Sequence, residues 1–169
     1  VYFAVSDRTG GLGDRLVVKD CSDSVVYERT ISDDQKRIAS SLVIEEGNLY
    51  YFLRDEDQSL QLLSWDPDAD GERVLYQTRE AGEPRHITLC GEGGFLTWFE
   101  GAELVIFDLR REGVAQRINT NGRQDYSSVM DGYLAYQWTD SHSGDTMITR
   151  VRLDGTEPSM TIKSVLGDD

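Results

Sequence analysis

Short apolar runs recur along the chain, and each of them is closed by an aspartate. The four aspartates follow one another at intervals of 46, 42 and 46 residues: Asp20, Asp66, Asp108 and Asp154. The runs that precede them have the length of a β-strand, and they read Leu16-Val17-Val18-Lys19, Leu62-Leu63-Ser64-Trp65, Leu104-Val105-Ile106-Phe107 and Arg150-Val151-Arg152-Leu153. After three of the aspartates, a turn leads to another predicted strand, which ends at Thr30, Thr78 or Thr120.

A period of 40 to 50 residues made of short strands is typical of the blades of a β-propeller. We therefore predict an all-β fold of about four four-stranded antiparallel meanders, the first of them incomplete. The predicted blades cover residues 1–35, 36–82, 83–124 and 125–169, in a single propeller region spanning 1–169.

The second repeat shows the predicted strands most clearly. Alternating apolar residues and Asn, Asp and Gly turns place them at 38–45, 49–54, 59–65 and 72–78. The first strand of a blade lines the axis of a propeller, and the corresponding strands of the third and fourth repeats are predicted at 86–90 and 126–130.

The predicted strands do not close a ring by themselves. The first repeat lacks its inner strand, and the last stops after an outer strand, so no strand remains to complete the final blade. Because open sheet edges invite pairing, we expect further blades or a partner chain to complete the ring. The chain opens directly on a strand rather than on Met, which suggests a processed or trimmed piece.

Charge narrows the classes of partner. A formal net charge of −14 argues against nucleic acid, which requires a basic patch, and no apolar run is long enough for membrane insertion. Cys21 and Cys90 are predicted to be free thiols, which favours a reducing compartment without excluding an exported protein. The acidity fits either a solvated surface or a protein of a salt-loving organism.

The turn and the aromatic strand that follows it, combined with the aspartate period, resemble TolB-like and related WD40-like propeller repeats. The resemblance is carried by three segments: Gly47-Asn48-Leu49-Tyr50-Tyr51, Gly93-Gly94-Phe95-Leu96-Thr97-Trp98 and Asp131-Gly132-Tyr133-Leu134-Ala135-Tyr136. It departs from the TolB-like pattern in lacking Ser-Pro-Asp-Gly before the second strand. The resemblance implies a prokaryotic, often exported protein that binds proteins or glycans, or the gating domain of a peptidase.

Arginines recur at the predicted entries to the inner strands. Arg37, Arg85 and Arg123 lie there, and His86 and Asp125 are close by in the sequence. In a propeller these loops share one face, so the arginines would ring the mouth of the channel and hold a carboxylate, a sulfate or an acidic peptide. The alternative is local pairing with nearby acids, which contributes little at a surface.

Two acidic segments invite a chemical interpretation. Asp66, Asp68 and Asp70 alternate before Gly71 as in a calcium loop, but Gln77 stands where a bidentate Glu would close it, so an acidic turn is the preferred interpretation. The segment from Asp140 to Asp145 holds one of the two histidines, although acidic loops serve solvation more often than catalysis.

The sequence therefore predicts a non-enzymatic binding module that recognises a protein segment or a small anionic ligand, without a cofactor or a metal. It contains no Gly-x-Ser-x-Gly elbow and no HExxH or Cys/His metal spacing. Two alternatives stay open. One is the propeller domain of a larger hydrolase or lyase whose catalytic residues lie elsewhere, and the other is a structural surface or assembly protein from a high-salt organism.

Overall fold

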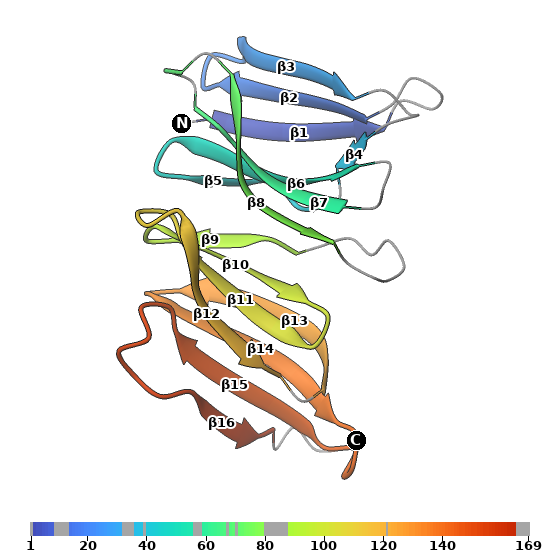
Figure 1. Ribbon diagram of the computed structural model, residues 1–169, viewed down its shortest axis with the longest axis vertical. Helices are drawn as coiled ribbons and strands as arrows, with labels where there is room; N and C mark the ends of the chain where they lie inside the picture. Colours follow the sequence, from blue (N-terminus) through green and yellow to red (C-terminus); the bar gives the residue numbers. More distant parts are fainter. Residues whose placement is uncertain are drawn as a thin grey trace. The chain divides into compact units, whose positions relative to one another are not determined.

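The computed structural model describes residues 2–8, 14–31, 36–38, 40–55, 59–66, 68–69, 71–79, 88–120 and 122–164. Within these ranges every regular element is a β-strand, and the strands form four antiparallel sheets (Figure 1). The chain divides into two compact units, residues 1–89 and 90–169, with two sheets in each.

The first unit holds a three-stranded and a five-stranded sheet. The former runs in the order β1 (Tyr2–Arg8), β2 (Asp14–Asp20) and β3 (Val25–Ile31). The latter consists of β4 (Lys36–Ile38), β5 (Val43–Glu45), β6 (Asn48–Asp55), β7 (Ser59–Trp65) and β8 (Glu72–Arg79). Both β4 and β5 pair with β6, and β7 and β8 follow in sequence order.

The second unit holds two four-stranded sheets, each with its strands in sequence order. One consists of β9 (Cys90–Glu92), β10 (Phe95–Glu100), β11 (Glu103–Asp108) and β12 (Gly113–Asn119). The other consists of β13 (Gly122–Met130), β14 (Tyr133–Asp140), β15 (Thr146–Arg152) and β16 (Met160–Lys163). These sheets confirm the predicted all-β meanders and their number, including a first meander of three strands.

The inner strand of the second sheet is interrupted, where the sequence predicted one strand over 38–45. Between β4 and β5, the hydroxyl of Ser40 accepts a hydrogen bond from Phe52 N at 2.8 Å and donates one to Ser41 O at 2.7 Å. Ser41 Oγ in turn accepts from Leu89 N at 2.8 Å and donates to Leu89 O at 3.0 Å. Side-chain hydroxyls thus replace ladder hydrogen bonds here, and the strand breaks.

The inner strands of the third and fourth sheets also differ from their predicted positions. β9 covers 90–92, whereas the predicted strand over 86–90 ended at Cys90. The strand continues to Glu92 because the hairpin turn is made by Gly93 and Gly94, with φ of 62° and 83°. Residues 80–87 lie outside the described ranges. β13 begins at Gly122 rather than at 126, because the ladder continues through a register shift between Gln124 and Tyr126.

Each unit is held together by apolar side chains between its two sheets. In the first unit, Leu16 and Val18 of β2 cluster with side chains of β6 and β7, namely Leu49, Tyr51, Leu53, Leu63 and Trp65. In the second unit, Leu104 and Ile106 of β11 cluster with Leu134, Tyr136, Val151 and Leu153. Burying such side chains is the main favourable contribution to folding, and here it joins neighbouring meanders face to face.

The recurring aspartates cap the hairpin between the last two strands of each sheet. In all four, Oδ1 accepts a hydrogen bond from the backbone N–H two residues later, at 2.8 to 2.9 Å; the pairs are Asp20 with Ser22, Asp66 with Asp68, Asp108 with Arg110 and Asp154 with Thr156. An aspartate that bonds its own backbone in this way stabilises a tight turn. The repeat therefore has a structural cause.

The described part of the chain contains no helix with the length and apolar character needed to cross a bilayer.

Candidate functional site

The sequence predicted that three arginines in loops ring a channel. Where the backbone is described, these arginines lie in strands. Arg37 is in β4 and pairs with Arg54, while Arg123 is in β13 and pairs with Thr139. Asp125 falls at the register shift of β13. The predicted loop positions were wrong because both ladders extend further than the hydrophobic pattern indicates. Arg85 and His86 lie outside the described residues.

Arg37 and Arg123 nevertheless occupy equivalent places in their sheets. Each is the second residue of the strand that begins its sheet. The residue before it faces an aspartate that ends the next strand, since Lys36 pairs with Asp55 and Gly122 pairs with Asp140. The two arginines thus occupy the same register position in β4 and in β13, each within its own sheet.

The Asp140–Asp145 segment is a self-capped hairpin. Asp140 Oδ1 accepts a hydrogen bond from His142 N at 3.0 Å, and Ser143 Oγ donates to Asp140 Oδ2 at 3.1 Å. These bonds, the backbone one first, hold the pKa of Asp140 below its ordinary value. Asp145 forms an ion pair with Lys163 at 2.8 Å.

The histidine of this hairpin is not arranged as a catalytic relay. Ser141 Oγ lies 3.4 Å from His142 Nδ1, and Asp140 Oδ1 lies 3.7 Å from the same nitrogen. In a catalytic relay, one ring nitrogen of the histidine accepts the hydrogen bond of the serine, and the other ring nitrogen donates to a carboxylate that orients the ring. With both neighbours on Nδ1 and the His142 side chain 95% exposed, the hairpin serves as a turn.

The proposed calcium loop is only partly described. Asp66 Oδ1 caps its turn through Asp68 N, and Ala69 N donates to Asp66 O at 3.2 Å, whereas Asp70 lies outside the described residues. Among the residues whose positions are given, no group of three or more His, Cys, Asp or Glu side chains is placed to hold a metal ion. Cys21 and Cys90 are free thiols, as predicted.

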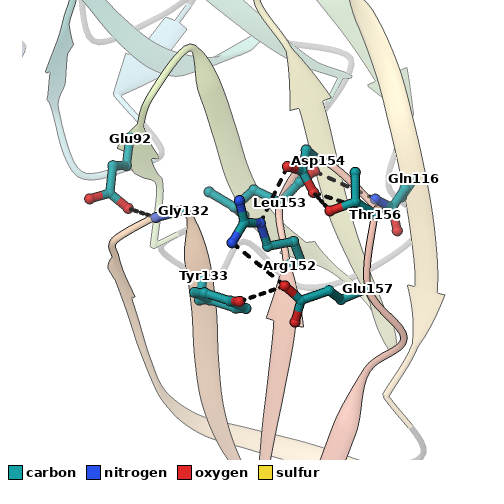
Figure 2. A network of polar contacts seen from close by, with 9 residues as sticks. All are labelled: Glu92, Gln116, Gly132, Tyr133, Arg152, Leu153, Asp154, Thr156 and Glu157. Atoms are coloured by element: carbon teal, nitrogen blue, oxygen red, sulfur yellow. Dashed lines mark hydrogen bonds and ion pairs between the residues drawn. The ribbon is translucent and has the colours of Figure 1, made fainter.

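A cationic and aromatic cluster lies on the β13–β16 sheet. The guanidinium carbons of Arg150 and Arg152 lie 4.6 and 4.8 Å from the ring centroid of Tyr133. The Tyr133 hydroxyl donates to Glu157 Oε1 at 2.8 Å, and Arg152 pairs with Asp154 at 3.2 Å and with Glu157 at 3.7 Å (Figure 2). Sequence analysis did not identify this cluster. The available signal was the pair of arginines in the run before Asp154, where the other runs carry at most one polar residue, Lys19 or Ser64.

Glu92 joins the two sheets of the second unit. Its Oε2 accepts a hydrogen bond from Gly132 N at 3.0 Å (Figure 2). Its Oε1 accepts one from Asp131 N at 2.9 Å, so the carboxylate of β9 caps the β13–β14 turn. Gln116 Nε2 adds a longer contact to Leu153 O at 3.5 Å. Charge-assisted bonds to backbone N–H groups are among the stronger hydrogen bonds in proteins, so Glu92 is a structural connector.

A comparable polar connection joins the sheets of the first unit. Arg29 of β3 donates to the Tyr51 hydroxyl at 2.9 Å and pairs with Glu72 of β8. Tyr27 and Tyr51 both donate to the same Glu72 carboxylate, and burial raises the pKa of both tyrosines. An arginine of one sheet thus meets a carboxylate and a tyrosine of the next.

Sequence comparisons find no match for this chain, whereas comparison with solved structures finds similar folds. No family model matches the chain, and no curated protein matches it. A prolyl endopeptidase structure matches with a TM-score of 0.61 and 13% identity, covering 98% of this chain and 26% of that one. BamB from Moraxella catarrhalis matches with a TM-score of 0.55 and 12% identity over 95% and 47%. A nidogen/laminin complex structure matches with a TM-score of 0.53 and 12% identity over 99% and 64%.

These similarities define the class of fold. The matching structures include proteins of the β-propeller type, and the four antiparallel meanders of this chain are β-propeller blades. At 12–13% identity the likeness concerns the fold alone. The chain spans less than two thirds of the length of each of these three structures.

Proposed function

We propose that this chain is a non-enzymatic interaction module. In this proposal, arginines at the ends of the inner strands of a β-propeller bind a protein segment or a small anionic ligand. The ligand-binding residues are Arg37, Arg85 and Arg123, with His86 and Asp125 beside them. Propellers host many unrelated activities, so the proposal depends on the site and not on the fold.

The observation that supports the proposal is the equivalence of Arg37 and Arg123. Each follows the residue that pairs with the terminal aspartate of the next strand. Blades repeated around an axis bring equivalent positions to a shared mouth. Guanidinium groups bind carboxylates and sulfates through two parallel hydrogen bonds, so converging arginines suit an anionic partner.

The test uses defined anions as probes. Sulfate and a hexaglutamate peptide are titrated into the protein and into the double variant Arg85→Ala/Arg123→Ala by calorimetry. We expect the variant to bind the peptide about tenfold more weakly or worse, the effect of losing about 1.4 kcal/mol. Binding to the unchanged protein should weaken as NaCl rises, because exposed charges are screened.

Arg111→Ala supplies the matched control. The Arg111 side chain is 83% exposed in the β11–β12 hairpin, where it lies 3.4 Å from Asp108. Its removal takes away one positive charge, where the double variant loses two, without touching the inner strands, so it should leave peptide binding unchanged. Equal losses in the control and the double variant, or no loss in either, would contradict the arginine site.

A second candidate is the propeller domain of a larger hydrolase, and the similarity to a prolyl endopeptidase favours it. This proposal requires catalytic residues in a neighbouring domain of the full-length protein. A serine-hydrolase elbow in the remaining polypeptide, together with peptidase activity of the whole protein, would support it over the interaction module. A complete polypeptide that consists of propeller blades alone would contradict it.

The finer family resemblance is also a proposal. TolB-like repeats imply a prokaryotic, exported protein, and the acid excess also fits an assembly protein of a high-salt organism. Independently of both ideas, we propose that further blades or a partner chain complete the ring. The full-length gene would test both, because it would show any export signal and the total number of repeats.

A further inference from the structure

Tyr27 and Tyr133 share two properties. Each residue is partly exposed, and each hydroxyl donates a hydrogen bond to a carboxylate. The acceptor of Tyr27 is Glu72, and the acceptor of Tyr133 is Glu157. A phenol that loses an electron becomes a very strong acid, so its oxidation requires an acceptor for the hydroxyl proton. The carboxylates supply that acceptor, and both tyrosines are therefore chemically suited to the loss of one electron.

The rings of the two tyrosines have different neighbours. The ring centroid of Tyr27 lies 4.5 Å from that of Trp65, so the two π systems are in contact. The ring of Tyr133 instead lies against the guanidinium groups of Arg150 and Arg152. A positive charge at the ring opposes the removal of an electron. An indole in contact has the opposite effect, because an oxidised indole can take an electron from the phenol beside it.

Glu72 is a carboxylate that the fold holds in place beside Tyr27. Its side chain is 17% exposed, and Arg29 pairs with it. Burial raises the pKa of Tyr27, so the phenol keeps its proton until an electron is removed. The proton then has a path along the existing hydrogen bond to Glu72. Tyr51 donates to the same carboxylate but is fully buried, so a reagent in solution does not reach its ring.

We propose that Tyr27 is the preferred site of oxidative nitration in this protein. The oxidant is the carbonate radical anion, which takes one electron from Tyr27 and becomes carbonate, while the phenolic proton passes to Glu72. Where the oxidant takes the electron from Trp65, the oxidised indole recovers one from Tyr27. Nitrogen dioxide then forms a bond from its nitrogen to the ring carbon beside the hydroxyl-bearing carbon. That ring carbon loses its proton to water, and the phenolic oxygen regains a proton from Glu72. The proposal does not rest on the arginine site of the inner strands.

The experiment treats the full chain with peroxynitrite in bicarbonate buffer, which supplies both radicals, and quantifies nitrotyrosine at each site by mass spectrometry. We expect more nitrotyrosine at Tyr27 than at any other tyrosine, including Tyr133, which serves as the matched reference in the same sample. Glu72→Gln keeps the shape of the side chain but removes the proton acceptor. Trp65→Phe keeps an aromatic ring but removes the indole. Each variant should lower nitration of Tyr27 to the level of Tyr133 and leave Tyr133 unchanged.

The direction of the change separates this proposal from a purely structural role. If Glu72 and Trp65 served packing alone, either variant would loosen the contact between the sheets, expose the Tyr27 ring and raise its nitration. Tyr27→Phe keeps a ring against Trp65 and should remove the largest share of the total nitrotyrosine, whether or not the Glu72 variant folds. The proposal is overturned if another tyrosine is nitrated more than Tyr27. It is also overturned if nitration of Tyr27 is undiminished in either folded variant, or if Tyr27→Phe leaves the total unchanged.

Discussion

At the scale of single residues, each recurring aspartate directs its Oδ1 to the backbone N–H two residues later. Of the four bonds, the one made by Asp108 is most shielded from water, because Asp108 is only 8% exposed. A buried backbone N–H that loses its acceptor costs more than an exposed one, which water can satisfy. Asp108 therefore offers the clearest test of the turn-capping role.

Replacing Asp108 by Ala should lower the free energy of unfolding by about 1–2 kcal/mol, because Arg110 N loses its acceptor. Asp108→Asn keeps an oxygen at the same place and should cost distinctly less. Urea unfolding followed by tryptophan fluorescence measures both. Asp68→Ala, at an exposed side chain in the corresponding turn of the second sheet, should change little. A loss in the Asn variant equal to that in the Ala variant would mean that the charge, and not the turn bond, matters.

At the scale of elements, neighbouring meanders are joined by an apolar centre and a polar connection. In the second unit the connector is Glu92, which receives both Asp131 N and Gly132 N. Asp131 and Gly132 both have positive φ, at 55° and 76°. The carboxylate therefore holds a turn whose backbone conformation is unfavourable for Asp131.

Glu92→Ala should increase hydrogen exchange at the amides of Asp131 and Gly132 and lower the free energy of unfolding by about 1–2 kcal/mol. Glu92→Gln keeps a single acceptor oxygen and should protect one amide better than the other. Mass spectrometry or NMR of exchange reports the two sites. Glu103→Ala, which removes an exposed pairing with Arg117, is the control. Unchanged exchange in Glu92→Ala would show that the turn is held by other contacts.

At the scale of the whole molecule, two electrostatic effects oppose one another as pH falls. The net charge is −14 at pH 7, so the acidic side chains repel one another in the compact state. Protonation of some of them should therefore first stabilise the fold. Several carboxyls have the opposite effect. Hydrogen bonds from Ser22 and from Thr156 hold the pKa of Asp20 and of Asp154 below the ordinary value of 3.8. A hydrogen bond from Arg15 likewise holds the pKa of Glu28 below its ordinary value of 4.5.

A carboxyl whose pKa is lower in the folded state stabilises the fold above its unfolded pKa and loses that effect as pH falls through the folded value. We therefore expect the melting temperature to rise or stay level from pH 7 to about pH 5 and to fall below about pH 4. Adding NaCl should raise the melting temperature at pH 7 and make it depend less on pH between pH 5 and pH 7, because salt screens the repulsion between carboxylates. A melting temperature that is highest at pH 7 in low salt would contradict this balance.

Much of the fold followed from local sequence features. Asp20, Asp66, Asp108 and Asp154 each cap a turn through a hydrogen bond that spans two residues, so these turns and the strands that lead into them were predictable. The boundaries of the inner strands were not. They depend on ladder bonds to distant strands and on Ser40, whose hydroxyl replaces a ladder bond near β4 and β5.

The candidate sites likewise combine features that the sequence shows with features that only the tertiary structure shows. Arginines recurring before the inner strands are visible in the sequence, and the paired strands put Arg37 and Arg123 at the same register position, each within its own sheet. The partners of Glu92 and the exposure of Arg150 are decided by packing between sheets, because residues far apart in the chain supply the contacts. The sequence alone thus determined the repeated strands and turns, whose hydrogen bonds are local. Only the tertiary structure decided which face of each sheet is covered, since that depends on neighbouring sheets.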